Sequence, residues 1–68
     1  MDKTFKIIEL VGTSIEGYEA AIQNAVTHAS KSLKGLSWYE VIQMRGGIKD
    51  GKISEYQVII KVGFKLVN

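Results

Sequence analysis

The sequence predicts an α+β domain of order strand, helix, strand, strand, in which a three-stranded antiparallel sheet curls around one helix. Three observations support this: an early strand-like run, a helical repeat of apolar residues after it, and two further strand-like runs joined by an Asp-Gly turn. The helix makes the connection between the first two strands a crossover, and the hairpin places the last strand antiparallel to its predecessor. Pairing with the first strand as well makes the last strand central.

The first strand is expected over residues 1–11 and is apolar on both faces. Phe5, Ile7 and Ile8 lie among lysines and a glutamate, so the alternation of apolar and polar residues is imperfect. Such a strand would be covered on both sides, with the second cover coming from another subunit. Gly12 is expected to end the strand.

A helix is expected over residues 14–34. Thr13 and Glu16 have the spacing of a capping box at its start, and Gly35 is suited to cap its end. Its apolar stripe recurs at three- and four-residue steps and consists of Ile15, Tyr18, Ala21, Ile22, Ala25, Val26, Ala29 and Leu33. This stripe predicts an amphipathic helix packed on the sheet.

The second and third strands are expected over residues 36–47 and 53–67, joined by a hairpin turn at Asp50-Gly51. The third alternates sharply. Its apolar face, predicted to cover the helix, is Tyr56, Val58, Ile60, Val62, Phe64 and Leu66, and its polar face is Glu55, Gln57, Lys61 and Lys65. Because Ile59 interrupts the polar face, we expect a contact surface there.

The size of the chain indicates that it needs partners. A chain of 68 residues buries only about 60% of its unfolded surface, and a single core of this size contributes roughly 3 to 5 kcal/mol. The absence of cysteine excludes disulfides and thiolate ligands, and one histidine cannot form a histidine metal cluster. Self-association is therefore the most available source of additional buried surface.

Charge and hydropathy limit the other partners. The net charge of +2 is too small to argue for nucleic acid, and no apolar run approaches the roughly 20 residues of a membrane span. Because the first residues carry lysine and aspartate, we do not expect them to act as a signal peptide. We expect a cytoplasmic protein that binds neither nucleic acid nor membranes.

Two residues of the second strand have chemistry that a plain core does not require. Trp38, the only tryptophan, can be a core filler, a subunit contact or a stacking platform for a planar ligand. Arg45, the only arginine, offers a planar cation suited to phosphate or carboxylate. A straight strand would point them to opposite faces, unless Gly46 and Gly47 allow a bulge that changes the parity.

No catalytic residues are expected. Glu40 and Glu55 can pair with lysines across strands, and nothing indicates an acid/base dyad. His28 lies near the edge of the apolar stripe, where it would be an interface or surface residue.

The chain as a whole, a single domain over residues 1–68, resembles the dodecins, small flavin-binding proteins that assemble as hollow homododecamers. The marks of the resemblance, in chain order, are Glu9–Ser14 (ELVGTS), the alanine-rich helix, Leu36–Val41 (LSWYEV), Arg45-Gly46, Glu55–Val58 (EYQV) and Val62–Phe64 (VGF). The spacing of Arg45 after Trp38 is similar to that of the bacterial branch.

The resemblance implies a ligand site at a two-fold contact between subunits. Paired flavin rings would stack there between copies of Trp38, and Gln57 would hydrogen-bond the polar edge of the isoalloxazine, since a carboxamide both donates and accepts. Arg45 would lie near the ligand and favour FMN over uncharged riboflavin, with riboflavin or FAD as other flavins and coenzyme A as a further ligand. The implied role is storage, buffering and photoprotection of flavin without catalysis.

Two other functions remain open from the residues. The same site could serve a flavin-dependent reductase, although the sequence has no nicotinamide fingerprint. Aromatic residues on a sheet could instead stack RNA bases, although the near-neutral charge argues against it.

Overall fold

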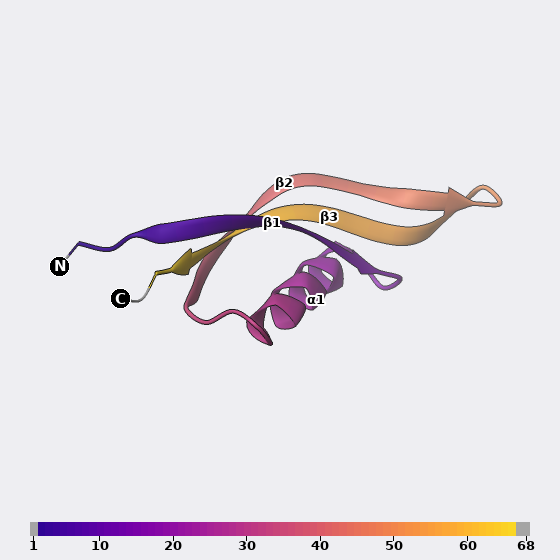
Figure 1. Cartoon of the computed structure of the whole chain (residues 1–68). Helices are drawn as coiled ribbons and strands as arrows, with labels where there is room; N and C mark the ends of the chain where they lie inside the picture. Colours follow the sequence, from indigo (N-terminus) through magenta and orange to yellow (C-terminus); the bar gives the residue numbers. More distant parts are fainter. Residues whose placement is uncertain (1, 67–68) are drawn as a thin grey trace.

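The computed structural model describes residues 2–66 and confirms the predicted order of elements. The chain forms β1 (Phe5–Ser14), α1 (Tyr18–Ser30), β2 (Leu36–Lys49) and β3 (Lys52–Lys65). The sheet order is β1-β3-β2 with both pairings antiparallel, so the last strand is central, as predicted. Figure 1 shows the helix lying under one face of a curved sheet.

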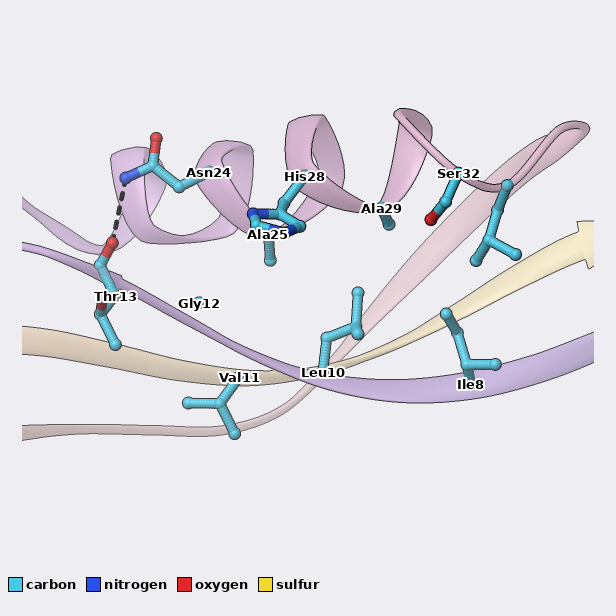
Figure 2. A pocket seen from close by; sticks show the side chains of 11 residues that line it. Ile8, Leu10, Val11, Gly12, Thr13, Asn24, Ala25, His28, Ala29 and Ser32 are labelled. Carbon is cyan, nitrogen blue, oxygen red and sulfur yellow. Dashed lines mark hydrogen bonds between the residues drawn. The ribbon is translucent and has the colours of Figure 1, made fainter.

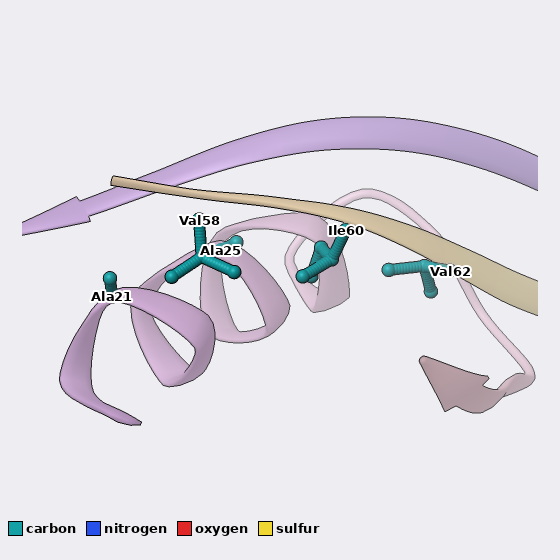
Figure 3. Close-up of a cluster of buried hydrophobic side chains, with 5 residues drawn as sticks. All are labelled: Ala21, Ala25, Val58, Ile60 and Val62. Carbon is teal, nitrogen blue, oxygen red and sulfur yellow. The ribbon is translucent and has the colours of Figure 1, made fainter. Parts of the chain in front are cut away.

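The core lies between α1 and the middle of the sheet. Ala21 and Ala25 of the helix meet Val58, Ile60 and Val62 of β3, and these side chains point toward one another in Figure 3. The partly buried residues packed around them are Ile8, Leu10, Tyr18, Ile22, Val26 and Leu36. The middle of the predicted apolar face of the last strand, Val58, Ile60 and Val62, is confirmed, whereas Leu66 is exposed and lies beyond the end of β3. The alanines of the stripe let the helix approach the sheet closely.

One copy of the chain is elongated. Its radius of gyration is 14.0 Å and its extents are 53 × 20 × 13 Å, whereas a compact chain of this length would have a radius of gyration of about 11 Å. The β2–β3 hairpin projects beyond the helix (Figure 1), and α1 packs against β1 and β3. The exposed large apolar residues of β2 are Trp38, Tyr39, Val41, Ile42, Met44 and Ile48. This distribution fits the expectation that other subunits supply buried surface.

The prediction that Gly12 ends the first strand is wrong, because β1 continues to Ser14. Gly12 pairs with Val58 inside the sheet. A Cβ at this position would overlap the backbone of Ala21 and lie 2.9 Å from the Cβ of Ala25. Glycine is present here because the helix passes directly over the strand, and not because the strand stops.

The predicted capping box is also wrong. Thr13 pairs with Gln57 in the sheet, which removes it from the helix start. The helix begins at Tyr18, with Gly17 as its N-cap residue. The turn before it is held by Ser14, whose Oγ accepts a hydrogen bond from the amide of Glu16 at 2.9 Å.

The helix ends at Ser30, four residues before the predicted end. The amide of Leu33 still donates to the carbonyl of Ala29 at 3.0 Å, but the chain then turns back toward the sheet. Gly35 does not cap the helix. It has a φ of +78° and lies directly before β2. Its carbonyl accepts a hydrogen bond from the amide of Lys65 at 2.9 Å.

The Asp-Gly hairpin is confirmed. Asp50 and Gly51 have φ values of 53° and 76°, the positive pair that a two-residue type I′ turn requires. β2 extends two residues beyond the predicted Gly47, and β3 starts one residue early and ends at Lys65. Met1 and Val67, which the predicted strands included, lie outside the described residues.

Candidate functional site

The face of the sheet opposite α1 has no second helix or strand layer over it within residues 2–66, and it contains the predicted site residues. Because side chains alternate along a strand, Gln57, Ile59, Lys61 and Gly63 of β3 lie on this face, opposite the buried Val58, Ile60 and Val62. In register beside them on β1 are Thr13, Val11, Glu9 and Ile7. We call this surface the open face.

A bulge brings Trp38 and Arg45 onto the open face together. Trp38 is paired with Gly63 and Arg45 with Gln57, so seven steps along β2 match six along β3. The extra residue lies between Val41 and Gln43. The predicted change of parity between positions 38 and 45 thus occurs at Ile42. A register irregularity is also present between Gly47 and Ile48, beside the predicted Gly46-Gly47 bulge, but it lies beyond Arg45 and does not act on that parity.

The indole of Trp38 lies across the sheet. It covers Gly63, its partner on β3, and meets the ring of Phe5 from β1 edge to face, with ring centroids 5.0 Å apart and an interplanar angle of 64°. The residue keeps 42% of its surface exposed in one copy of the chain. All three strands thus contribute to an aromatic platform that one copy leaves partly open.

A hydrogen-bonded row lies farther along the open face and consists of Arg45, Gln57 and Glu55; we call it the polar row. Arg45 Nε donates to Gln57 Oε1 at 2.8 Å, and Gln57 Nε2 donates to Glu55 Oε1 at 2.8 Å. A guanidinium only donates and a carboxylate only accepts, so these two neighbours fix which end of the amide is oxygen. Gln57 still has one N–H and one lone pair of its oxygen to offer a ligand.

The platform and the polar row are far apart within one copy. Gly63 and Gln57 are six residues apart on β3, which corresponds to about 20 Å of strand. The cross-strand sets Glu9–Lys61–Glu40 and Val11–Ile59–Gln43 lie between them. The structure therefore brings Arg45 and Gln57 together and leaves Trp38 apart.

Three residues of these groups were missed as site neighbours from the sequence. Phe5 was assigned only to the first strand, Gly63 only to a motif, and Glu55 to pairing with lysine. Phe5 and Gly63 become neighbours of Trp38 through strand register, whereas Glu55 lies two residues from Gln57 on the same face of β3. The β2–β3 register that aligns Trp38 with Gly63 changes at Ile42, where no glycine marks the bulge.

A separate groove of about 660 Å³ runs between α1 and β1 (Figure 2). Its lining is mostly apolar, and the exposed His28 lies on its helix side. Asn24 Nδ2 donates to the carbonyl of Thr13 at 3.0 Å, which ties the helix to the end of β1 across one end of the groove. None of the predicted site residues lines it.

The acidic and histidine side chains do not gather into a metal site in the described part of the chain, since no group of three or more His, Cys, Asp or Glu occurs there. In residues 2–66 no helix has the length and apolar character needed to cross a bilayer.

The fold and the open face define a small sheet-and-helix protein with an exposed aromatic platform and a hydrogen-bonded amide-guanidinium pair. The Dodecin family model matches residues 4–67, and the chain belongs to this family of small flavin-binding proteins. It is 53% identical over 66 residues to the dodecin of Thermus thermophilus, covering 97% of this chain and 96% of that protein.

Solved dodecin structures have the same fold. The dodecin from Streptomyces coelicolor superposes with a TM-score of 0.95 at 46% identity, covering 98% of this chain and 96% of that one. The dodecin from Streptomyces davaonensis gives 0.96 at 43% identity, with both chains covered completely. These likenesses confirm the α+β fold and the family resemblance of the sequence motifs.

Proposed function

We propose that the protein binds FMN between copies of the chain, as a homododecamer that stores and buffers the flavin and suppresses its photochemistry. The observation that carries this proposal is the shared placement of the Trp38 platform and the Arg45–Gln57 pair on the open face, produced by the bulge at Ile42. A planar ring and a polar edge are the two features of an isoalloxazine that such groups recognise.

Trp38 would supply the stacking surface. One side of its indole lies against Gly63, and the residue is 42% exposed, so a flat ligand can stack on the other side. Two copies facing each other would enclose a pair of isoalloxazine rings. Because an indole in contact with an excited flavin donates an electron to it, the bound flavin would lose its fluorescence.

The polar row would recognise the edge of the ring and the phosphate. The free lone pair and N–H of Gln57 match the N3–H and a neighbouring carbonyl of the isoalloxazine. The terminal NH₂ groups of Arg45 are suited to a phosphate, which FMN has and riboflavin lacks. FMN is therefore the proposed flavin, with riboflavin as a weaker ligand and FAD as another flavin that the site could hold.

The site must be shared between copies. With about 20 Å of strand between the two groups, one ring stacked on Trp38 does not reach Gln57 of the same copy. A neighbouring copy would place its Arg45–Gln57 pair at the edge of that ring. The exposed apolar residues of β2 and the elongated shape of one copy support such an assembly.

The T. thermophilus dodecin offers a parallel. Solved variants of it carry the substitutions W38F and R45A, and each superposes on this chain with a TM-score of 0.94 at 49% identity. The residues replaced in those variants, a tryptophan and an arginine, are of the same types as Trp38 and Arg45 here.

We propose no catalytic step for this site, because a ring enclosed between two indoles leaves little room for a hydride donor. Steady oxidation of NADH by the flavin-loaded protein would show a reductase instead. Coenzyme A binding and cytoplasmic location stay predictions.

The test is a fluorescence titration of FMN with the flavin-stripped protein, run beside size-exclusion chromatography. We expect saturable quenching near one flavin per chain in a peak much larger than a monomer. Trp38→Ala should weaken binding by about 5- to 150-fold, since an aromatic stack contributes about 1–3 kcal/mol. Tyr39→Ala is the matched control, because Tyr39 is a neighbouring exposed aromatic on the opposite face of β2. Full affinity and quenching in Trp38→Ala would refute the proposal.

A further inference from the structure

The backbone of Gly63 lies directly beneath the six-membered ring of Trp38. A Cβ added to Gly63 would overlap three consecutive atoms of that ring, Cε2, Cζ2 and Cη2, at nearly equal separations. If the added Cβ lay in the plane of the ring and outside it, it would be clearly closer to the middle atom of these three than to the other two. The Cβ direction of Gly63 therefore meets the face of the indole and not its edge.

This contact fixes the height of the indole above the sheet. Carbon atoms in van der Waals contact lie about 3.5–4.0 Å apart, so a methyl group at Gly63 would force the ring to rise by about 1 Å. The three nearest atoms to the added Cβ all belong to Trp38. The indole, and not the neighbouring backbone, is thus what meets the methyl first.

Phe5 limits the indole in a second direction. Its ring meets the indole at 64° with 5.0 Å between centroids, a geometry that favours edge-to-face attraction. Lying on β1, Phe5 approaches from across the sheet, whereas Trp38 originates on β2. The indole is thus supported from below by β3 and from the side by β1.

We propose that Gly63 is a positioning residue for flavin binding, which sets the height of the Trp38 platform, and that Phe5 limits its rotation. This inference rests on the proposed stacking function. It specifies what sets the width of the slot, by which we mean the space between two facing Trp38 platforms that holds the ring pair. Two facing platforms would each rise by about 1 Å with a methyl group at Gly63. The slot between them would then be too narrow for the ring pair, with no change in the chemistry of Trp38 itself.

The experiment is a double-mutant cycle of Gly63→Ala and Trp38→Phe, read by FMN titration and size-exclusion chromatography. In the presence of Trp38, Gly63→Ala should weaken FMN binding at least tenfold. In the Trp38→Phe background it should change affinity less than threefold, because phenylalanine lacks the outer atoms of the indole that the methyl meets. Gly17→Ala is the matched control, since nothing lies within 4 Å of a Cβ added there.

A second readout needs no flavin. Trp38 is the only tryptophan, so the intrinsic emission of the flavin-stripped protein and its quenching by acrylamide report the exposure of this indole alone. Gly63→Ala should make the indole more accessible, and Gly17→Ala should not. Unchanged accessibility together with unchanged affinity would overturn the inference.

The outcomes separate the two proposals. If the parent protein binds no FMN, the proposed function fails, and the emission of Gly63→Ala still decides the positioning claim. If Gly63→Ala does not assemble but Gly63→Ala/Trp38→Phe does, the conflict lies with the indole and the inference is supported. If neither assembles, the methyl conflicts with the sheet itself and the inference is overturned.

Discussion

The two faces of the sheet differ in how far one copy of the chain covers them. The face under α1 is complete within one chain, with Val58, Ile60 and Val62 almost fully buried against alanines of the helix. The open face keeps Trp38, Ile7 and Val11 between 42% and 53% exposed. The first face stabilises the fold of one copy. The second has apolar and planar groups that residues 2–66 leave exposed, and we expect another copy or a ligand to cover them.

This comparison is tested most strongly by two adjacent isoleucines on opposite faces of β3. Ile60→Ala should lower the free energy of unfolding by about 2–5 kcal/mol, because it leaves a cavity in the buried core. Ile59→Ala, the control on the open face, should lower it less and act mainly on assembly. Chemical denaturation and size-exclusion chromatography measure the two effects. Equal losses of stability, with the oligomer intact, would show that the open face is packed within the chain.

Sequence patterns predicted the covered face well and the open face poorly. Alternation along β3 identified Val58, Ile60 and Val62, and the Asp50-Gly51 turn set the hairpin, because both depend on local residues. The strand register across the bulge at Ile42 depends on pairing between strands and leaves no local mark. Gly12 shows the same limit, because its role comes from the helix above it.

The ends of the helix were mispredicted for a related reason. Thr13 and Glu16 have the right residue types for a capping box, but β3 pairs with β1 as far as Ser14. Thr13 is therefore part of the sheet and cannot cap the helix, which begins at Tyr18. Local preferences hold only where no tertiary partner competes for the same backbone groups.

The second prediction concerns the division of the open face into two groups. Separately, Trp38→Ala and Gln57→Ala should each bind FMN poorly. The two variants are then unfolded together in equal amounts and reassembled. About half of the subunit pairs should be mixed, and each mixed pair contains one site with an intact indole and an intact amide. About a quarter of all binding sites should therefore be recovered. Quenching titration measures the recovery, and mixing Trp38→Ala with itself is the control. No recovery in proven mixed oligomers would place both groups of one site in a single copy.

Within the polar row, Arg45 should distinguish flavins by charge. Arg45→Ala should weaken FMN binding about 10- to 150-fold and leave riboflavin within about threefold, because a charge-assisted hydrogen bond to phosphate contributes about 1.5–3 kcal/mol. Parallel titrations with the two flavins measure this ratio. Arg45→Lys is the control, since it keeps the charge without the planar fork. An equal loss for both flavins would mean that Arg45 acts on the ring through Gln57 and not on the phosphate.

The smallest effect is expected at the other end of the row. Glu55→Leu removes the acceptor that holds Gln57 Nε2, so the amide can rotate away from the ring edge. A lost hydrogen bond of this kind costs about 0.5–1.5 kcal/mol, or roughly two- to tenfold in affinity. The loss should be similar for FMN and riboflavin, because both present the same ring edge. Glu55→Gln keeps an acceptor at the same position and should retain near-parental affinity. If Glu55→Gln lost as much as Glu55→Leu, the charge of Glu55 and not its hydrogen bond would be what the site requires.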